Sequence, residues 1–224
     1  MADSGFNGMM APVTDTRRAR ILLADDHALV AAGLAKLLEQ DFDLLAICSD
    51  GRQLLAEVER HRPDVVVLDI SMPNLNGLEA ARRLRKIAPE VKIVFVTVHS
   101  DLAYAAEAFR AGASGYVLKG SAVSELREAV TNALRGRTFL TPLLDRGLLD
   151  AALQQPEHRS PLTRRQQEVL QLVAEGHSAK DIGDSLKISS KTVEFHKSLI
   201  MKRLNLHSVA ELTRYAIEHG ISAH

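Results

Sequence analysis

The chain has 224 residues, and its 28 lysine and arginine residues balance its 28 aspartate and glutamate residues, so the formal net charge is zero. This balance argues against a uniformly basic protein, and any surface for nucleic acid must be local. The single cysteine, Cys48, excludes an intramolecular disulfide framework and a cysteine-rich zinc site. Because no apolar run approaches the ~20 residues that span a bilayer, we expect a cytoplasmic protein with no membrane partner.

The chain is longer than a typical single domain of about 100–150 residues, which favours two domains joined by a linker. Residues 1–18 show little periodicity and are predicted to be a disordered extension. We expect an α/β domain over residues 19–136, a linker that contains a helix over residues 137–160, and a small all-helical domain over residues 161–224.

In the first domain, short apolar runs alternate with amphipathic segments, a pattern typical of a parallel sheet covered on both faces. The expected strands are 21–23, 44–47, 65–68, 93–96 and 116–118, and the expected helices are 28–39, 52–60, 78–86, 102–111 and 122–135. Gly112 and Gly136 stand where helix C-caps are expected. The sequence therefore predicts a doubly wound α/β domain with a five-stranded parallel sheet, whose functional crevice lies at the carboxyl ends of the strands.

After Gly136 the strand signals stop, and residues 143–153 are predicted to form a helix in the linker. Four short helices follow, over residues 163–175, 179–187, 190–205 and 209–219. Three pairs resemble capping boxes that mark helix starts: Thr163 with Gln166, Ser178 with Asp181, and Ser208 with Glu211. The apolar positions expected to form a small core are Ile182, Leu186, Ile188, Val193, Ile200 and Leu204.

Charged side chains follow three of the predicted strands directly. Asp25 and Asp26 come after the first apolar run, Asp69 after the third, and Lys119 after the fifth. Because the first and third strands are neighbours in such a sheet, the three carboxylates converge in one crevice, where a hard cation such as Mg²⁺ would offset their repulsion. A carboxylate beside Mg²⁺ and a lysine is suited to attack a phosphoryl donor.

Four stretches of this domain resemble the receiver domain of two-component response regulators, in the same order and spacing. They are ILLADDH (21–27), PDVVVLDISMPNLNGLEA (63–80), VTVHSD (96–101) and AGASGYVLK (111–119). The resemblance covers about residues 20–135. It implies that Asp69 is the phosphoacceptor and that Asp26, Asp69 and the backbone carbonyl of Ser71 bind Mg²⁺.

The same resemblance assigns the remaining residues of the site. Asp25 would act through the water shell of the metal, and Lys119 is the conserved lysine. Thr97 matches the switch hydroxyl and Tyr116 the switch aromatic. Ser71 and His99 stand at positions that tune the dephosphorylation rate.

In the second domain, the third helix carries an exposed stripe with basic residues, one aromatic residue and one acid: Lys191, Glu194, Phe195, Ser198 and Lys202. Such a stripe fits a major groove, although a charged helix face is more often simply solvated. Residues 162–204 closely resemble the LuxR/FixJ-type helix-turn-helix, with 190–205 as the recognition helix. By this resemblance Glu194, Phe195 and Ser198 face bases, whereas Lys191, Lys197 and Lys202 contact phosphates. Gly183, where the family commonly has alanine, is expected to cost its helix about 1 kcal/mol.

Together the two domains resemble the NarL/FixJ family of two-component response regulators. The resemblance implies a transcription regulator, not an enzyme, in which phosphorylation of Asp69 controls sequence-specific DNA binding. Its expected partners are DNA, a histidine kinase or a small phosphodonor, and a second copy of the chain when phosphorylated.

Two alternatives are left open by the residues. One is a phosphohydrolase that uses the same aspartate nucleophile and Mg²⁺, but such hydrolases usually carry a second acid two residues after the nucleophile, where this chain has Ser71. The other is a regulator that acts independently of phosphorylation or works mainly through protein contacts.

Overall fold

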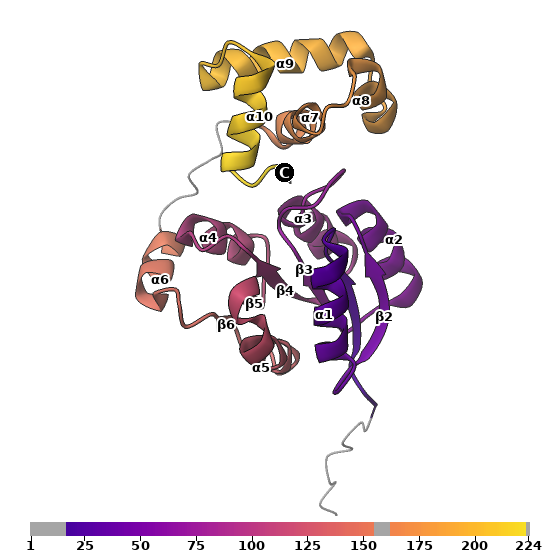
Figure 1. The fold of residues 1–224 in the computed structure, drawn as a ribbon, viewed down its shortest axis with the longest axis vertical. Helices are drawn as coiled ribbons and strands as arrows, with labels where there is room; N and C mark the ends of the chain where they lie inside the picture. Colours follow the sequence, from indigo (N-terminus) through magenta and orange to yellow (C-terminus); the bar gives the residue numbers. More distant parts are fainter. Residues whose placement is uncertain (1–16, 155–161, 223–224) are drawn as a thin grey trace, which may run out of the picture.

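A computed structural model describes residues 17–154 and 162–222 and divides them between a sheet-containing domain and a smaller helical one (Figure 1). Of residues 1–18, predicted to be disordered, 1–16 lie outside the described residues, whereas Arg17 is described and pairs with Asp64 at 3.1 Å. The strands are β1 (Arg20–Ala24), β2 (Asp43–Cys48), β3 (Val65–Leu68), β4 (Lys92–Thr97), β5 (Gly115–Leu118) and β6 (Phe139–Leu140). The helices of the first domain are α1 (Ala28–Leu38), α2 (Gly51–His61), α3 (Gly77–Ile87), α4 (Leu102–Arg110), α5 (Ala122–Leu134) and α6 (Arg146–Gln154), with a 3-10 turn over Lys119–Ser121.

The strands form one parallel sheet in the order β2-β1-β3-β4-β5-β6. This confirms the doubly wound parallel fold, but the sheet has six strands where five were predicted. The additional strand, β6, pairs Phe139 with Gly115 and Leu140 with Tyr116. β6 lies in the segment predicted as linker. The sequence did not reveal it, because two residues are too few to show the alternation typical of a strand.

Side chains alternate between two cores on opposite faces of the sheet, as the pleat of a strand requires. Along β1, Ile21 and Leu23 contact the core formed with α1 and α5. Leu22 and Ala24 contact the opposite core, to which α2, α3 and α4 contribute. Helix α6 adds the fully buried Leu149 to this second core, so the helix predicted in the linker packs onto the α/β domain.

The second domain consists of α7 (Arg164–Ala174), α8 (Ala179–Leu186), α9 (Ser190–Leu204) and α10 (Val209–Glu218) around one core. Of the predicted core positions, Ile182, Val193 and Ile200 are buried, and the other three pack against them half-buried. Capping boxes are present at Thr163 and Ser178. Ser208 also caps α10, but the Glu211 carboxylate accepts from the backbone N–H of His207 at 2.7 Å.

The predicted cost of Gly183 is wrong for this fold. A Cβ atom at Gly183 would lie 2.7 Å from the carbonyl oxygen of Ile188, where α8 meets the turn that leads into α9. Alanine would therefore clash with backbone, and glycine is the residue that lets the two helices of the motif approach so closely.

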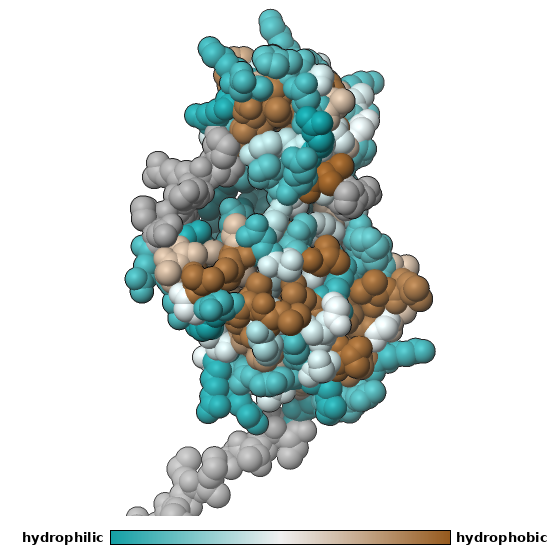
Figure 2. Space-filling model, turned by 60° about the vertical axis from the view of Figure 1, so that its left-hand side comes forward, coloured by the Kyte–Doolittle hydropathy of each residue, from teal (hydrophilic) through white to brown (hydrophobic). Residues whose placement is uncertain are grey.

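The surface differs in character between the two domains. Figure 2 shows apolar side chains gathered over the α/β domain on this face, whereas the helical domain above it is largely hydrophilic. Among the residues that the structure describes, no helix has both the length and the apolar character needed to cross a membrane.

The thiol of Cys48, at the end of β2, provides a test of this packing. Its side chain is fully buried, and burial, with smaller contributions from Glu57 and Asp50, raises the pKa of the thiol to about 12. Because the thiolate is the reactive form, we expect a disulfide reagent such as DTNB at pH 8 to label the native protein only as fast as it unfolds. Equal labelling rates in buffer and in urea would contradict this.

The same pKa predicts a pH dependence of stability. The folded pKa lies above the ordinary 9.0, so the folded state resists ionisation of Cys48 and the free energy of unfolding is expected to fall as pH rises from 9.0 towards 12. Urea unfolding of the wild type and of Cys48→Ala across this range measures it, since the variant loses this part of the slope.

Candidate functional site

The charged residues predicted at the strand ends meet at one edge of the sheet. β1 and β3 are hydrogen-bonded neighbours, which brings Asp25 and Asp26 beside Asp69. One ligand atom from each of Asp25, Asp26, His27 and Asp69 lies within 4.8 Å of the others. The parallel-sheet rule therefore placed these carboxylates correctly.

Lys119 joins two of the carboxylates. Its Nζ lies 2.7 Å from Oδ2 of Asp69 and 2.8 Å from Oδ2 of Asp25, and both carboxylates are almost completely buried. Burial by itself would lower the pKa of Lys119. The negative charge of Asp69, and the hydrogen bonds that Lys119 donates to Asp25 and Asp69, hold that pKa above its ordinary value. The ammonium is therefore charged, and it offsets part of the repulsion between the two acids.

The Asp69 carboxylate is held at both oxygens. Oδ1 accepts a hydrogen bond from the backbone N–H of Ile70 at 2.6 Å, and Oδ2 accepts from Lys119. Burial raises the pKa of Asp69, whereas Lys119 opposes the shift. The carboxylate is thus held in one position, and because its negative charge is buried, binding of a group that neutralises this charge is favoured.

The residues around Asp26 fit a hard divalent cation. Oδ1 of Asp26 is buried and accepts no hydrogen bond from the described residues, although Nδ1 of His27 lies 2.9 Å away. His27 is the N-cap residue of α1, and its backbone N–H donates to Asp25 at 2.9 Å. Three convergent carboxylates with such a buried oxygen form a donor set suited to Mg²⁺.

The predicted switch residues surround His99, in the loop between β4 and α4. The buried Thr97 hydroxyl accepts from the backbone N–H of His99 at 3.3 Å, and the Tyr116 hydroxyl donates to the His99 carbonyl at 2.8 Å. Burial raises the pKa of Tyr116, so the phenol keeps the proton that it donates. The Ser71 hydroxyl lies 2.9 Å from Nε2 of His99, which joins this loop to the one that follows Asp69.

The DNA-contact candidates lie on α9. Lys191, Glu194, Phe195, Ser198 and Lys202 are exposed, and Phe195 is the most conspicuous because 60% of it is accessible. Lys197 is half-buried and lies 3.1 Å from the Glu194 carboxylate. The helix thus presents the predicted stripe outward from the domain core.

Sequence reasoning did not anticipate that the two domains contact each other. Gln171 of α7 and Glu175, the C-cap residue of that helix, bind the loop between β3 and α3, and Arg83 of α3 pairs with Glu168. These residues carry no motif, and only their contacts in the folded chain reveal them.

Fold and site together define a class: an α/β domain with an acidic, lysine-bearing pocket at its sheet edge, joined to a helix-turn-helix domain. Residues 21–131 match the family described as response regulator receiver domain, and residues 160–216 match bacterial regulatory proteins of the luxR family.

The curated relatives extend over nearly the whole chain. The chain is 37% identical to the oxygen regulatory protein NreC of Staphylococcus epidermidis, over 89% of this chain and 97% of the relative. It is 34% identical to the transcriptional regulatory protein DegU of Brevibacillus brevis, over 91% of this chain and 94% of the relative. A solved LuxR-family response regulator from Aurantimonas sp. SI85-9A1 has a TM-score of 0.57 and 34% identity, over 61% of this chain and 99% of its own.

The chain therefore belongs to the NarL/FixJ family of two-component response regulators. It is a transcriptional response regulator with a receiver domain and a LuxR-type DNA-binding domain. The family consists of DNA-binding regulators and not of enzymes, which argues against the phosphohydrolase alternative.

Proposed function

We propose that Asp69 is the phosphoacceptor and that its phosphorylation controls sequence-specific DNA binding by α9. The observation that carries this proposal is the position of the Asp69 carboxylate, held 2.7 Å from Lys119 beside two further carboxylates. In phosphoryl transfer the protein mainly positions groups and neutralises charge, and both elements are present here.

Three side chains and one carbonyl would hold the metal. Asp26, Asp69 and the backbone carbonyl of Ser71 are proposed as direct Mg²⁺ ligands, and Asp25 as a ligand through water. When bound, Mg²⁺ would neutralise charge on the transferred phosphoryl group. The buried Oδ1 of Asp26, which accepts no hydrogen bond from the described residues, supports this assignment.

In the transfer itself, a carboxylate oxygen of Asp69 forms a bond to the phosphorus of the donor. The bond that breaks is P–N when the donor is a histidine kinase and P–O when it is a small acyl phosphate, and the electron pair leaves with the donor. Lys119, already beside Oδ2 of Asp69, stabilises the added negative charge.

Thr97 and Tyr116 would pass the change to the surface. In the structure, the Thr97 hydroxyl accepts a hydrogen bond from the backbone N–H of His99. We propose that the phosphoryl group attracts this hydroxyl and so breaks that hydrogen bond. Because Tyr116 holds the carbonyl of the same residue, the two switch residues together bias the loop before α4 between two states.

On DNA, we propose that Glu194, Phe195 and Ser198 face base edges and that Lys191, Lys197 and Lys202 contact phosphates. The pairing of Lys197 with Glu194 is no obstacle, since such partly exposed ion pairs contribute at most about 1 kcal/mol.

Phosphorylated copies are proposed to dimerise, so that two helices read half-sites about one helical turn apart. The apolar surface of the receiver in Figure 2 supports contact between receivers. A protein that binds chromosomal DNA acts in the cytoplasm, which we propose as its location.

The test is selection of bound sequences from a random DNA pool by the full chain, with and without beryllofluoride plus Mg²⁺ as a phosphoryl mimic. We expect tighter binding of one sequence class with the mimic. Equal specific binding in both states would contradict phosphate control while leaving DNA binding intact, and no specific binding in either state would contradict both.

A further inference from the structure

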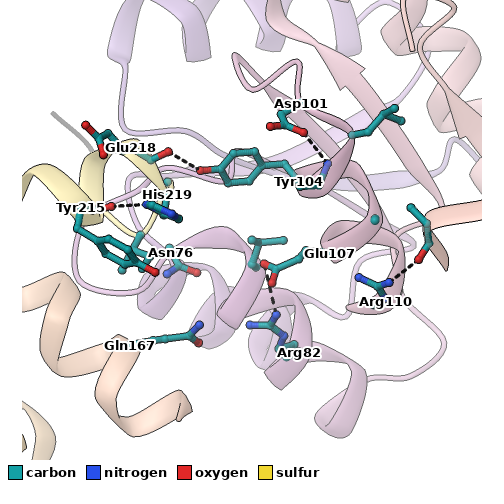
Figure 3. Close-up of a pocket in the computed structure, with 17 residues that line it drawn as sticks. Asn76, Arg82, Asp101, Tyr104, Glu107, Arg110, Gln167, Tyr215, Glu218 and His219 are labelled. Atoms are coloured by element: carbon teal, nitrogen blue, oxygen red, sulfur yellow. Dashed lines mark hydrogen bonds and ion pairs between the residues drawn. The ribbon is translucent and has the colours of Figure 1, made fainter. Parts of the chain in front are cut away.

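The DNA-binding domain lies across the carboxyl edge of the receiver sheet, with α7 and α10 towards the receiver (Figure 1). A cavity of about 610 Å³ remains between the domains, lined by residues of α3 and α4 on one side and of α7 and α10 on the other (Figure 3). The stripe on α9 stays exposed in this arrangement, with Phe195 60% accessible. Docking of the domains therefore does not cover the proposed base-reading residues.

The interface instead binds the loop that follows Asp69. Gln171 of α7 is only 2% exposed. Its Nε2 donates to the Met72 carbonyl at 2.9 Å, and its Oε1 accepts from the backbone N–H of Asn76 at 3.2 Å and from the Asn76 side chain at 3.3 Å. A buried amide that satisfies both its donor and its acceptor in another domain holds that segment tightly.

The segment held by Gln171 is the one that the phosphorylation chemistry uses. Met72 directly follows Ser71, whose carbonyl is a proposed metal ligand, and Asn76 is the N-cap of α3. At the C-cap of α7, Glu175 accepts from the backbone N–H of Asn74 at 3.2 Å. The whole loop is thus bound from the DNA-binding domain.

A second contact fixes the loop before α4. The rings of His99 and Tyr104 stack with centroids 4.2 Å apart. The Tyr104 hydroxyl donates to the Glu218 carbonyl at 3.3 Å (Figure 3). Gly220 approaches so closely that a Cβ there would lie 3.0 Å from Nε2 of His99. Since the same His99 atom contacts the Ser71 hydroxyl, the two loops and the DNA-binding domain form one connected network.

We propose that Gln171 is a positioning residue for the phosphoacceptor loop, through which the docked DNA-binding domain slows phosphoryl uptake at Asp69. This inference rests on the proposed function of Asp69. A loop bound at Met72 and Asn76 resists the rearrangement that three new phosphoryl oxygens and a metal require. The same contact disfavours the phosphorylated loop at equilibrium, and because equilibrium coupling between sites is reciprocal, phosphorylation in turn weakens the Gln171 contact.

The first experiment compares phosphorylation of the full-length wild type and Gln171→Leu by acetyl phosphate with Mg²⁺, followed on phosphate-affinity gels. Leucine keeps the side-chain size but cannot bind Met72 or Asn76, and we expect uptake to accelerate by about 5-fold or more. Gln167→Leu is the matched control, because Gln167 lies on the same helix and lines the cavity and is not among the residues that bind the Asp69 loop. Its rate should equal that of the wild type.

Hydrogen exchange provides a measurement that a merely structural role would not change. The Asn76 amide donates to Gln171, so its exchange should accelerate when beryllofluoride and Mg²⁺ are added to the wild type. If the wild type is phosphorylated but Gln171→Leu is no faster, or if exchange at Asn76 is unchanged by the mimic, the inference is overturned and the function of Asp69 stands. A wild type that takes up no phosphoryl group would overturn the proposed function itself.

Discussion

Replacement of Asp69 by asparagine is expected to abolish phosphoryl uptake by the full-length protein. The amide is nearly the same size, but its single oxygen can accept only one of the two hydrogen bonds that Ile70 and Lys119 donate to separate carboxylate oxygens. It also has no anionic oxygen to attack phosphorus. Uptake from acetyl phosphate with Mg²⁺ should fall to background, and beryllofluoride should no longer change DNA binding.

The matched control is Asp101→Asn. Asp101 caps α4 by accepting from the backbone N–H of Ala103 at 2.8 Å, a function that asparagine performs equally well. This variant should take up phosphoryl groups as the wild type does. If Asp69→Asn retained uptake, the acceptor would have to be another carboxylate, and Asp25 and Asp26 would be the next to test.

Replacement of Gly77 by alanine is expected to have the largest effect on stability. A Cβ at this position would lie 1.9 Å from the carbonyl oxygen of Asp69 and 2.9 Å from its carbonyl carbon. The helix start cannot move aside, because the backbone N–H of Gly77 donates to the Ile70 carbonyl at 2.8 Å. We expect the receiver to lose about 3 kcal/mol or more of unfolding free energy.

Urea unfolding followed by circular dichroism measures this change, with Gly33→Ala as the control. Gly33 lies within α1 and a Cβ there would have no neighbour within 4 Å, so alanine should stabilise the helix by about 0.5–1 kcal/mol. If Gly77→Ala unfolded at the same urea concentration as the wild type, the close contact between α3 and the Asp69 backbone would not exist in solution.

The core of the receiver could be predicted from local pattern alone. The run 65–68 is apolar at every position, which is what a strand buried on both faces requires, and β3 occupies those residues. Asp25, Asp26, Asp69 and Lys119 were brought together by a single rule, that parallel strands end at the same edge. Helix starts at Thr163 and Ser178 were equally predictable, since a capping box is a contact between residues three apart.

Other features were invisible for a physical reason. β6 consists of two residues, and its strand geometry comes from pairing with Gly115 and Tyr116, not from its own pattern. Gly183 resembled an ordinary helix position until its distance to Ile188 was known. In both cases the residue that determines the structure lies outside the element: β5 for β6, and Ile188 for Gly183 of α8.

By itself, the sequence determined the class of fold, the charged pocket and the exposed stripe of α9, because each depends on local periodicity or on strand direction. Only the tertiary structure decided that α7 binds the loop after Asp69. Gln171 and Met72 are 99 residues apart, and a glutamine has the same propensities whether it faces water or another domain. Its partners, a carbonyl and an amide of the backbone, are present at almost every residue, so no sequence signal could have selected them.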